Sequence, residues 1–80
     1  MVVREFTVEF SSFEDVVEFV SIATVQPFRI ITGNDTQWVN AKSLMGLVAL
    51  DHSAPMRVRM DCTPEQYEAF RSACNGFRAT

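Results

Sequence analysis

The chain has 80 residues, of which 48% are hydrophobic and 21% are charged, and its formal net charge is −3. This length predicts one domain, spanning residues 1–80, and the apolar fraction is ample for a packed core. The charges form no basic patch of the kind that nucleic-acid-binding proteins carry. No apolar run approaches the roughly 18 residues of a membrane-spanning helix. We therefore expect neither a nucleic acid nor a membrane as a binding partner.

The first residues lack the layout of a secretory signal peptide, because Arg4 and Glu5 interrupt any apolar region. The two cysteines, Cys62 and Cys74, form no CxxC pair. These features predict a cytoplasmic protein whose thiols are buried and reduced. A single histidine cannot complete a zinc site with two cysteines. We therefore expect no bound metal and no cofactor.

Residues 2–10 alternate between apolar and polar side chains, a period that is typical of a half-buried strand. Ser11 and Ser12 follow, each three residues before an acidic side chain, and this spacing favours the start of a helix. We predict an amphipathic helix there, ending near Val25 because Pro27 disfavours helix before it. The apolar residues that recur at helical spacing are Phe13, Val16, Val17, Val20 and Ala23.

Residues 28–32 and 36–40 are predicted to form a hairpin of two short strands. The intervening Gly33-Asn34-Asp35 tolerates positive φ angles, so we expect a tight turn. Residues 56–62 make the clearest strand, because apolar side chains alternate there with charged ones. One face of this strand is therefore buried and the other is wet, as in an antiparallel sheet that is covered on one side.

Residues 43–50 are predicted to form a short helix that is almost entirely apolar and that Ser43 can cap. A helix that is apolar all round also has an apolar outer face, which suggests a docking surface. Gly46 costs such a helix about 1 kcal/mol relative to alanine. This cost indicates that another group approaches the Gly46 backbone closely. The residues predicted to contact a partner are Lys42, Leu44, Met45, Leu47 and Val48.

The last helix begins with Thr63 as its cap and Pro64 at its first position, and Gln66 completes a capping box. Gly76 is placed to end it. Trp38 and Tyr67 are interpreted as aromatic residues of the core or its edge. The arginines expected to share the solvent face of the sheet are Arg29, Arg57 and Arg59.

The predicted order of elements is β-α-β-β-α-β-α. Helices of this number and length can cover one face of a sheet formed by the four strands. The sequence thus predicts an α+β fold, an open-faced two-layer sandwich with a four-stranded antiparallel sheet and three helices on one face.

The segment Lys42-Ser43-Leu44-Met45-Gly46 resembles the HPr family, the small histidine phosphocarriers of the bacterial sugar phosphotransferase system. That family has a lysine, a regulatory serine, an aliphatic residue, Met and Gly in the same order. The resemblance extends without gaps over about the last two thirds of the chain, and in element order over all of it. It implies an HPr-like fold and a bacterial protein that is not an enzyme. It also implies a protein partner, namely a phosphotransferase-system enzyme, an HPr-type serine kinase or a transcriptional regulator.

The resemblance also indicates a changed phosphate-acceptor region. HPr-like proteins carry the acceptor histidine at the start of the first long helix, followed closely by an arginine and a proline. Ungapped alignment from Ser43 places Ser12 at the histidine, Glu14 at the arginine and Asp15 at the proline. A serine needs a base to become a nucleophile, and two carboxylates repel an incoming phosphoryl group. We therefore expect no catalytic residue, and interpret all three as cap and dipole partners of the helix.

Three questions stay open at this point. The acidic cluster at Glu14 and Asp15 can be interpreted as a mimic of a permanently phosphorylated state. Ser43 matches the regulatory serine of HPr-like proteins, so it can be a phosphorylation site as well as a helix cap. His52 is interpreted as a solvated loop residue.

The expected function is regulation or protein binding without histidine phosphotransfer. The alternatives are a phosphocarrier with an unrecognised acceptor and an interaction domain unrelated to the phosphotransferase system.

Overall fold

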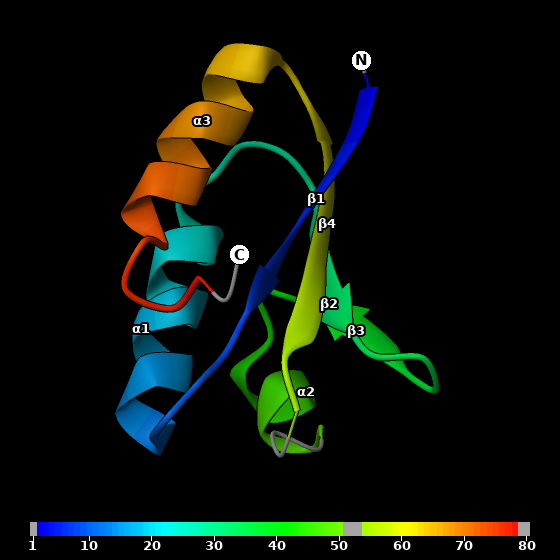
Figure 1. Cartoon of the computed structure of the whole chain (residues 1–80), viewed down its shortest axis with the longest axis vertical. Coiled ribbons are helices and arrows are strands. Elements are labelled where there is room, and N and C mark those ends of the chain that lie inside the picture. Colours follow the sequence, from blue (N-terminus) through cyan, green and yellow to red (C-terminus); the bar gives the residue numbers. More distant parts are fainter. Residues whose placement is uncertain (1, 51–53, 79–80) are drawn as a thin grey trace.

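The computed structural model describes residues 2–50 and 54–78, and the predicted order of elements is confirmed. The strands form one antiparallel sheet in the order β1-β4-β2-β3. The helices α1 and α3 lie side by side on one face of this sheet (Figure 1), so the protein is an open-faced two-layer α+β sandwich. The elements are β1 (Val2–Val8), α1 (Phe13–Thr24), β2 (Ile30–Gly33), β3 (Trp38–Asn40), α2 (Leu44–Val48), β4 (Met56–Cys62) and α3 (Pro64–Ala73).

Strand β4 lies in the middle of the sheet and follows the predicted alternation. It pairs with β1 from Val2↔Cys62 to Val8↔Met56, and with β2 on its other side. Every second side chain of β4, from Met56 to Cys62, is buried. The charged side chains between them point to the uncovered face, as expected for a sheet that is covered on one side only.

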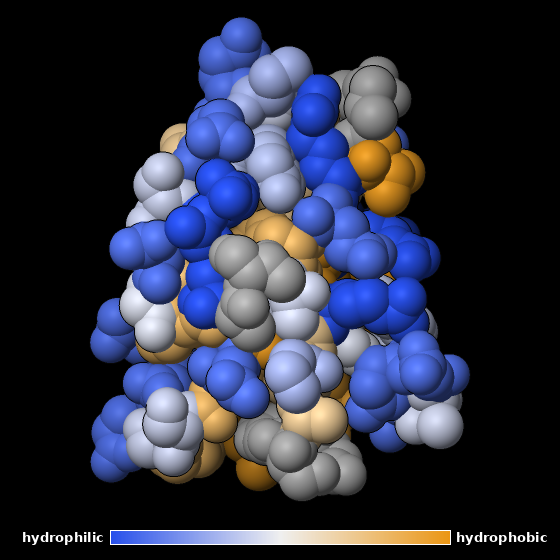
Figure 2. All heavy atoms as spheres, in the orientation of Figure 1, coloured by the Kyte–Doolittle hydropathy of each residue, from blue (hydrophilic) through white to orange (hydrophobic). Residues whose placement is uncertain are grey.

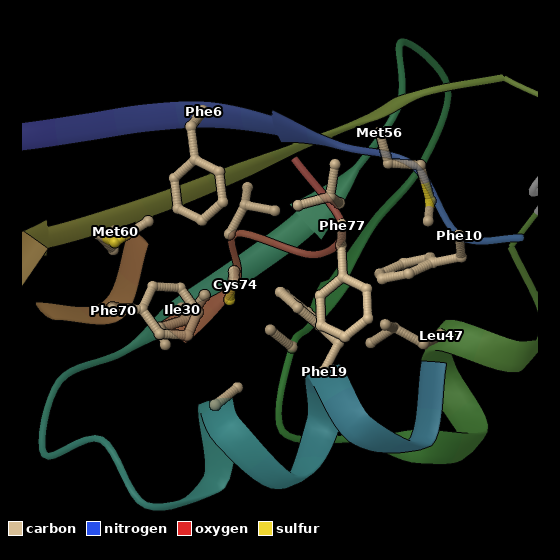
Figure 3. Close-up of a cluster of buried hydrophobic side chains, with 14 of the residues drawn as sticks. Phe6, Phe10, Phe19, Ile30, Leu47, Met56, Met60, Phe70, Cys74 and Phe77 are labelled. Atoms are coloured by element: carbon tan, nitrogen blue, oxygen red, sulfur yellow. The ribbon is translucent and has the colours of Figure 1, made fainter. Parts of the chain in front are cut away.

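A cluster of phenylalanine rings fills the space between the sheet and the helices (Figure 3). The Phe70 ring centroid of α3 lies 5.8 Å from that of Phe6 on β1 and 6.1 Å from that of Phe19 on α1. Phe10 continues the cluster, with its ring centroid 5.3 Å from that of Phe19. These edge-on and tilted arrangements are the ones that aromatic rings prefer, and their burial is the main source of stability.

Helix α1 turns a narrower face to the core than predicted. Val16, Phe19 and Ala23 are buried, whereas Phe13 is 57% and Val17 38% exposed. The buried residues recur at i, i+3 and i+7, which is one stripe of the helix, and Phe13 and Val17 lie on a neighbouring stripe. The prediction that these two residues face the core is therefore wrong.

The hairpin of β2 and β3 is held differently from the prediction. No residue in the described ranges has a positive φ angle. Instead, the Asn34 side-chain oxygen accepts hydrogen bonds from the backbone N–H groups of Thr36, at 2.9 Å, and Gln37, at 3.0 Å. This side chain organises a four-residue loop between Gly33 and Trp38 and leaves β3 shorter than expected.

Two element ends also differ from the prediction. β1 stops at Val8 because the Glu9 N–H donates to the carbonyl oxygen of Phe77 at 2.7 Å, outside the sheet. α3 ends at Ala73, and Gly76 does not take the left-handed conformation of a glycine cap. The chain turns instead through a hydrogen bond from Phe77 N–H to the Cys74 carbonyl at 2.9 Å, which returns the Phe77 ring to the core.

The two aromatic residues predicted for the core or its edge differ in position. Tyr67 packs edge-on against Phe6, with ring centroids 6.1 Å apart, so its prediction is confirmed. Trp38 lies on the uncovered face of the sheet, because it shares this face with Arg57 and Arg59. Their guanidinium carbons lie 5.2 and 4.6 Å from its ring centroid. For Trp38 the prediction is therefore wrong.

Both thiols are free and buried, as predicted. Burial raises the pKa of Cys74 to about 12 from the ordinary thiol value of 9.0. Burial also raises the pKa of Cys62, while Arg4 lowers it and Asp61 raises it to a smaller extent. The folded protein thus favours the protonated thiol more strongly than the unfolded chain does.

We expect the free energy of unfolding to fall as pH rises from about 9 towards 12. The cause is Cys74, whose raised pKa means that ionisation favours the unfolded chain in this window, whereas below pH 9 the thiol is protonated in both states. Urea unfolding at a series of pH values measures this slope. The matched variant is Cys74→Ala, in which the slope should be shallower. An equal slope in both proteins would contradict the assignment to Cys74.

Candidate functional site

The start of α1 holds the three residues of the predicted acceptor region. The Ser12 hydroxyl oxygen accepts a hydrogen bond from the Asp15 N–H at 3.3 Å, and the Asp15 carboxylate accepts one from the Ser11 N–H at 2.8 Å. The Ser12 side chain thus satisfies one N–H group that the helix leaves unpaired, and the Asp15 side chain bonds to the residue before the cap. Glu14 is exposed in the same first turn, where its carboxylate interacts favourably with the positive end of the helix dipole.

This geometry gives Ser12 the features of a cap and none of a nucleophile. Among the residues that the structure describes, the Asp15 N–H is the hydrogen-bond partner of its hydroxyl, and no side-chain base bonds to it. The nearest ionisable neighbours in sequence are the carboxylates of Glu14 and Asp15, which would repel a phosphoryl donor. His52 lies outside the described residues.

Ser43 caps the short helix α2. Its hydroxyl oxygen accepts a hydrogen bond from the Gly46 N–H at 3.1 Å. A Cβ atom on Gly46 would lie 3.2 Å from this oxygen and 3.3 Å from the Val39 Cβ. The predicted close approach to Gly46 is therefore confirmed, because a side chain there would press on both the cap and β3.

The exposed face of α2 meets the exposed stripe of α1 in one apolar surface, which we call the α1–α2 patch. Met45 is 85% and Phe13 57% exposed, and a shallow depression of about 360 Å³ is lined by Phe13, Leu44, Met45, Val48 and Ala49. In Figure 2, apolar side chains are visible at the lower end of the molecule, over the start of α1 and near α2. The members of the patch are Phe13, Val17, Leu44, Met45 and Val48.

This apolar surface is the candidate docking site, since large contiguous apolar patches on monomeric proteins often mark interaction sites. Leu44, Met45 and Val48 were predicted as partner contacts from the sequence, and all three are exposed. The contribution of α1 was missed. The spacing of Phe13 and Val17, four residues apart, was available as a signal for a second stripe on this helix.

Two other predicted contacts lie elsewhere. Leu47 is fully buried, so the prediction that its side chain contacts a partner is wrong; it lies on the inner side of α2 and joins the core. The Lys42 ammonium donates to the carbonyl oxygen of Gln26 at 2.8 Å, just after α1. This bond ties the segment after α1 to the start of α2.

The surroundings of the patch are acidic on the α1 side. Glu14, Asp15 and Glu18 lie on α1 beside Phe13 and Val17, and no basic residue lies in the last turn of this helix. The described residues contain no group of three histidine, cysteine or acidic side chains that could hold a metal ion. Within the same ranges, no helix has the length and apolar character needed to cross a membrane.

Comparison with known proteins identifies the fold. No family model matches the sequence. No curated protein matches it either. Among solved structures, the chain is similar to a phosphocarrier protein HPr from Bacillus anthracis str. Ames, with a TM-score of 0.66 and 23% identity. The match covers 90% of this chain and 94% of that one. The fold is therefore HPr-like, as the resemblance around Ser43 implied.

Proposed function

We propose that this protein is a phosphocarrier-family module of HPr type that binds other proteins through the α1–α2 patch and does not transfer phosphate through a histidine. The observation that carries the proposal is the patch itself, in which Met45 is 85% exposed on the outer face of α2. The HPr-like fold supports a place among partners of the phosphotransferase system. In this view the protein is regulatory, bacterial and cytoplasmic, and it is not an enzyme.

The acidic side of the patch determines the chemistry of the partner. The resemblance to HPr-like proteins implies that Glu14 replaces an arginine, and Asp15 and Glu18 extend the negative charge along α1. A partner of matching chemistry presents an apolar centre with basic side chains around it, because complementary charge favours encounter and orientation. The candidates are an enzyme of the phosphotransferase system, an HPr-type serine kinase and a transcriptional regulator. If the acidic cluster mimics a phosphorylated state, Glu14→Arg should abolish binding.

The absence of histidine phosphotransfer is testable with phosphoenolpyruvate and the first enzyme of the phosphotransferase system. We expect no acid-labile phosphate on this protein, because Ser12 is engaged as a cap and lacks a base. Intact mass before and after acid treatment measures the phosphate, with an ordinary HPr as the positive control. Stoichiometric acid-labile phosphate would support the alternative, a phosphocarrier that uses another acceptor such as His52.

Regulatory phosphorylation is proposed at Ser43. We expect an HPr-type serine kinase and ATP to add one phosphate, and Ser43→Ala to abolish it. Met45→Asp should slow the reaction about tenfold, because it places a charge in the centre of the docking surface while leaving Ser43 intact. Loss of the Ser43 cap alone costs about 1 kcal/mol, so Ser43→Ala should still fold. Intact mass over time measures both effects.

Val25→Asp is the matched control for Met45→Asp. Val25 is 77% exposed at the far end of α1, about 18 Å along the helix from Phe13. The variant Val25→Asp introduces the same negative charge in place of an apolar side chain, but outside the patch. Its rate of phosphorylation at Ser43 should therefore equal that of the unaltered protein. Phosphate on Ser43→Ala, or no phosphate on the unaltered protein, would overturn the assignment of Ser43. Equal slowing in both charge variants would overturn the role of the patch.

A further inference from the structure

The face of the sheet opposite the helices is a second uncovered surface. The strand register places Val3 and Glu5 of β1, Arg59 and Asp61 of β4 and Ile31 of β2 on this face. Trp38 of β3 lies on it as well. Apolar side chains on this face thus come from β1, β2 and β3, while β4, which lies between β1 and β2, contributes charged side chains of both signs.

In one half of this face, the charged side chains already have partners within the same chain. The guanidinium groups of Arg57 and Arg59 lie against the Trp38 ring. Each also pairs with a carboxylate, Arg57 with Asp35 and Arg59 with Glu5, both at 2.9 Å. These cations are therefore partly neutralised and are held in place on the sheet.

The other half is open and carries two charges without partners. A depression of about 260 Å³ is lined in part by Val3, Ile31, Arg29 and Asp61. Ile30 pairs with Met60, which places Arg29 next to Asp61 on the neighbouring strand. Both are exposed, yet within the described part of the chain neither side chain has a hydrogen bond or an ion pair. Val3, at the same depression, is 61% exposed.

We propose that this face binds a second copy of the chain, sheet against sheet, about a twofold axis. A twofold interface brings the same surface of both copies together, so that surface must complement itself. Here Arg29 of each copy pairs with Asp61 of the other, and Val3 and Ile31 of both copies cover the two depressions. The interface thus contains two ionic contacts, because the twofold axis repeats the Arg29–Asp61 pair. Its apolar part comes from Val3 and Ile31 of both copies.

The charge balance favours a second copy over a strongly charged partner. Around this face, Arg29, Arg57 and Arg59 are matched by Glu5, Asp35 and Asp61, so the face is neutral although the chain carries −3. The excess of acidic residues therefore lies on the rest of the molecule. A neutral face of mixed sign has no long-range preference for an acidic or a basic protein, whereas it can match its own copy.

The size of the face predicts a weak dimer. Four strands spaced about 4.8 Å apart, with a rise of about 3.3 Å per residue, give a surface on the order of 400 Å². A stable interface buries about 800 Å² on each partner. We therefore expect a dissociation constant between about 10 µM and 1 mM. Because the α1–α2 patch lies on the helical side, the dimer would leave both copies of that patch free.

Sedimentation equilibrium from about 10 µM to several mM tests the proposal on the full chain. We expect the unaltered protein to pass from monomer to dimer in this range. Arg29→Glu and Asp61→Arg should each raise the dissociation constant at least about tenfold, because like charges then meet across the axis. The double variant should dimerise again, because exchange of the two charges restores both ionic contacts.

The matched controls are Arg71→Glu and Glu68→Arg, which make the same changes of charge on α3, where these residues form a pair at 4.0 Å. They should leave dimerisation unchanged, as should Met45→Asp in the α1–α2 patch. A protein that stays monomeric throughout the range would overturn the proposal. So would a dimer that tolerates both single reversals at the sheet, or a double variant that stays monomeric.

Discussion

Replacing Phe70 with alanine is expected to lower the free energy of unfolding by about 3–5 kcal/mol. Phe70 is fully buried, and its ring lies 5.8 to 6.1 Å from the rings of Phe6, Phe19 and Phe28, centroid to centroid. These partners come from β1, α1 and the segment before β2, so truncation opens a cavity where three parts of the fold meet. Native proteins are stable by roughly 5–15 kcal/mol, so this loss is a large fraction of the total stability.

Urea unfolding followed by far-ultraviolet circular dichroism measures this effect. The matched control is Phe13→Ala, the same truncation at a side chain that is 57% exposed. It should change stability by less than about 1 kcal/mol, as most surface substitutions do. Comparable losses in the two variants would contradict the division into a buried cluster around Phe70 and an exposed patch around Phe13.

Replacing Gly33 with valine is expected to cost about 1–3 kcal/mol and to displace the β2–β3 hairpin. The reason is space and not backbone conformation, since Gly33 has no positive φ. A Cβ atom at this position would overlap the carbonyl oxygen of Gln37 and lie 2.8 Å from the Trp38 Cα. Both are backbone atoms, one in the loop and one at the start of β3, so they cannot move aside as a flexible side chain could.

Trp38 is the sole tryptophan, so its fluorescence reports on this hairpin directly, and urea unfolding gives the stability. Gly76→Ala is the control, because a Cβ atom there meets nothing within 4 Å. It should be neutral, or stabilise by up to about 1 kcal/mol through the unfolded chain. An unchanged tryptophan spectrum and stability in Gly33→Val would show that the strands are not as close as the structure places them.

The features of the fold that local rules determine were predictable from the sequence. The strand Met56–Cys62 has the predicted bounds because its alternation is uninterrupted. The capping box before α3 forms as expected, with Gln66 N–H donating to the Thr63 hydroxyl at 3.1 Å and Thr63 N–H to the Gln66 side chain at 3.0 Å. Ser12 and Ser43 cap their helices for the same reason.

The features that depend on particular side-chain hydrogen bonds or on strand register were not predictable in this way. The bounds of the hairpin strands depend on hydrogen bonds of the Asn34 side chain, which period and propensity do not contain. The position of Trp38 on the uncovered face follows from its register with Gly33. Half of the candidate docking surface, the exposed outer face of α2, was predicted. The α1 half was missed because helical period alone cannot distinguish a stripe that faces the core from one beside another helix.

The order of strands in the sheet determines how the chain can fold. Strand β1 pairs with β4 from Val2↔Cys62 onward, so its hydrogen-bond partners lie up to sixty positions away in the sequence. β2 also pairs with β4. Until residues 56–62 are available, β1 has no neighbour in the sheet and β2 has only β3, and closing such long loops slows folding relative to local contacts. Folding of this small domain during synthesis must therefore wait for β4, and a fragment that ends before it would leave β1 unpaired and one edge of β2 without its partner strand.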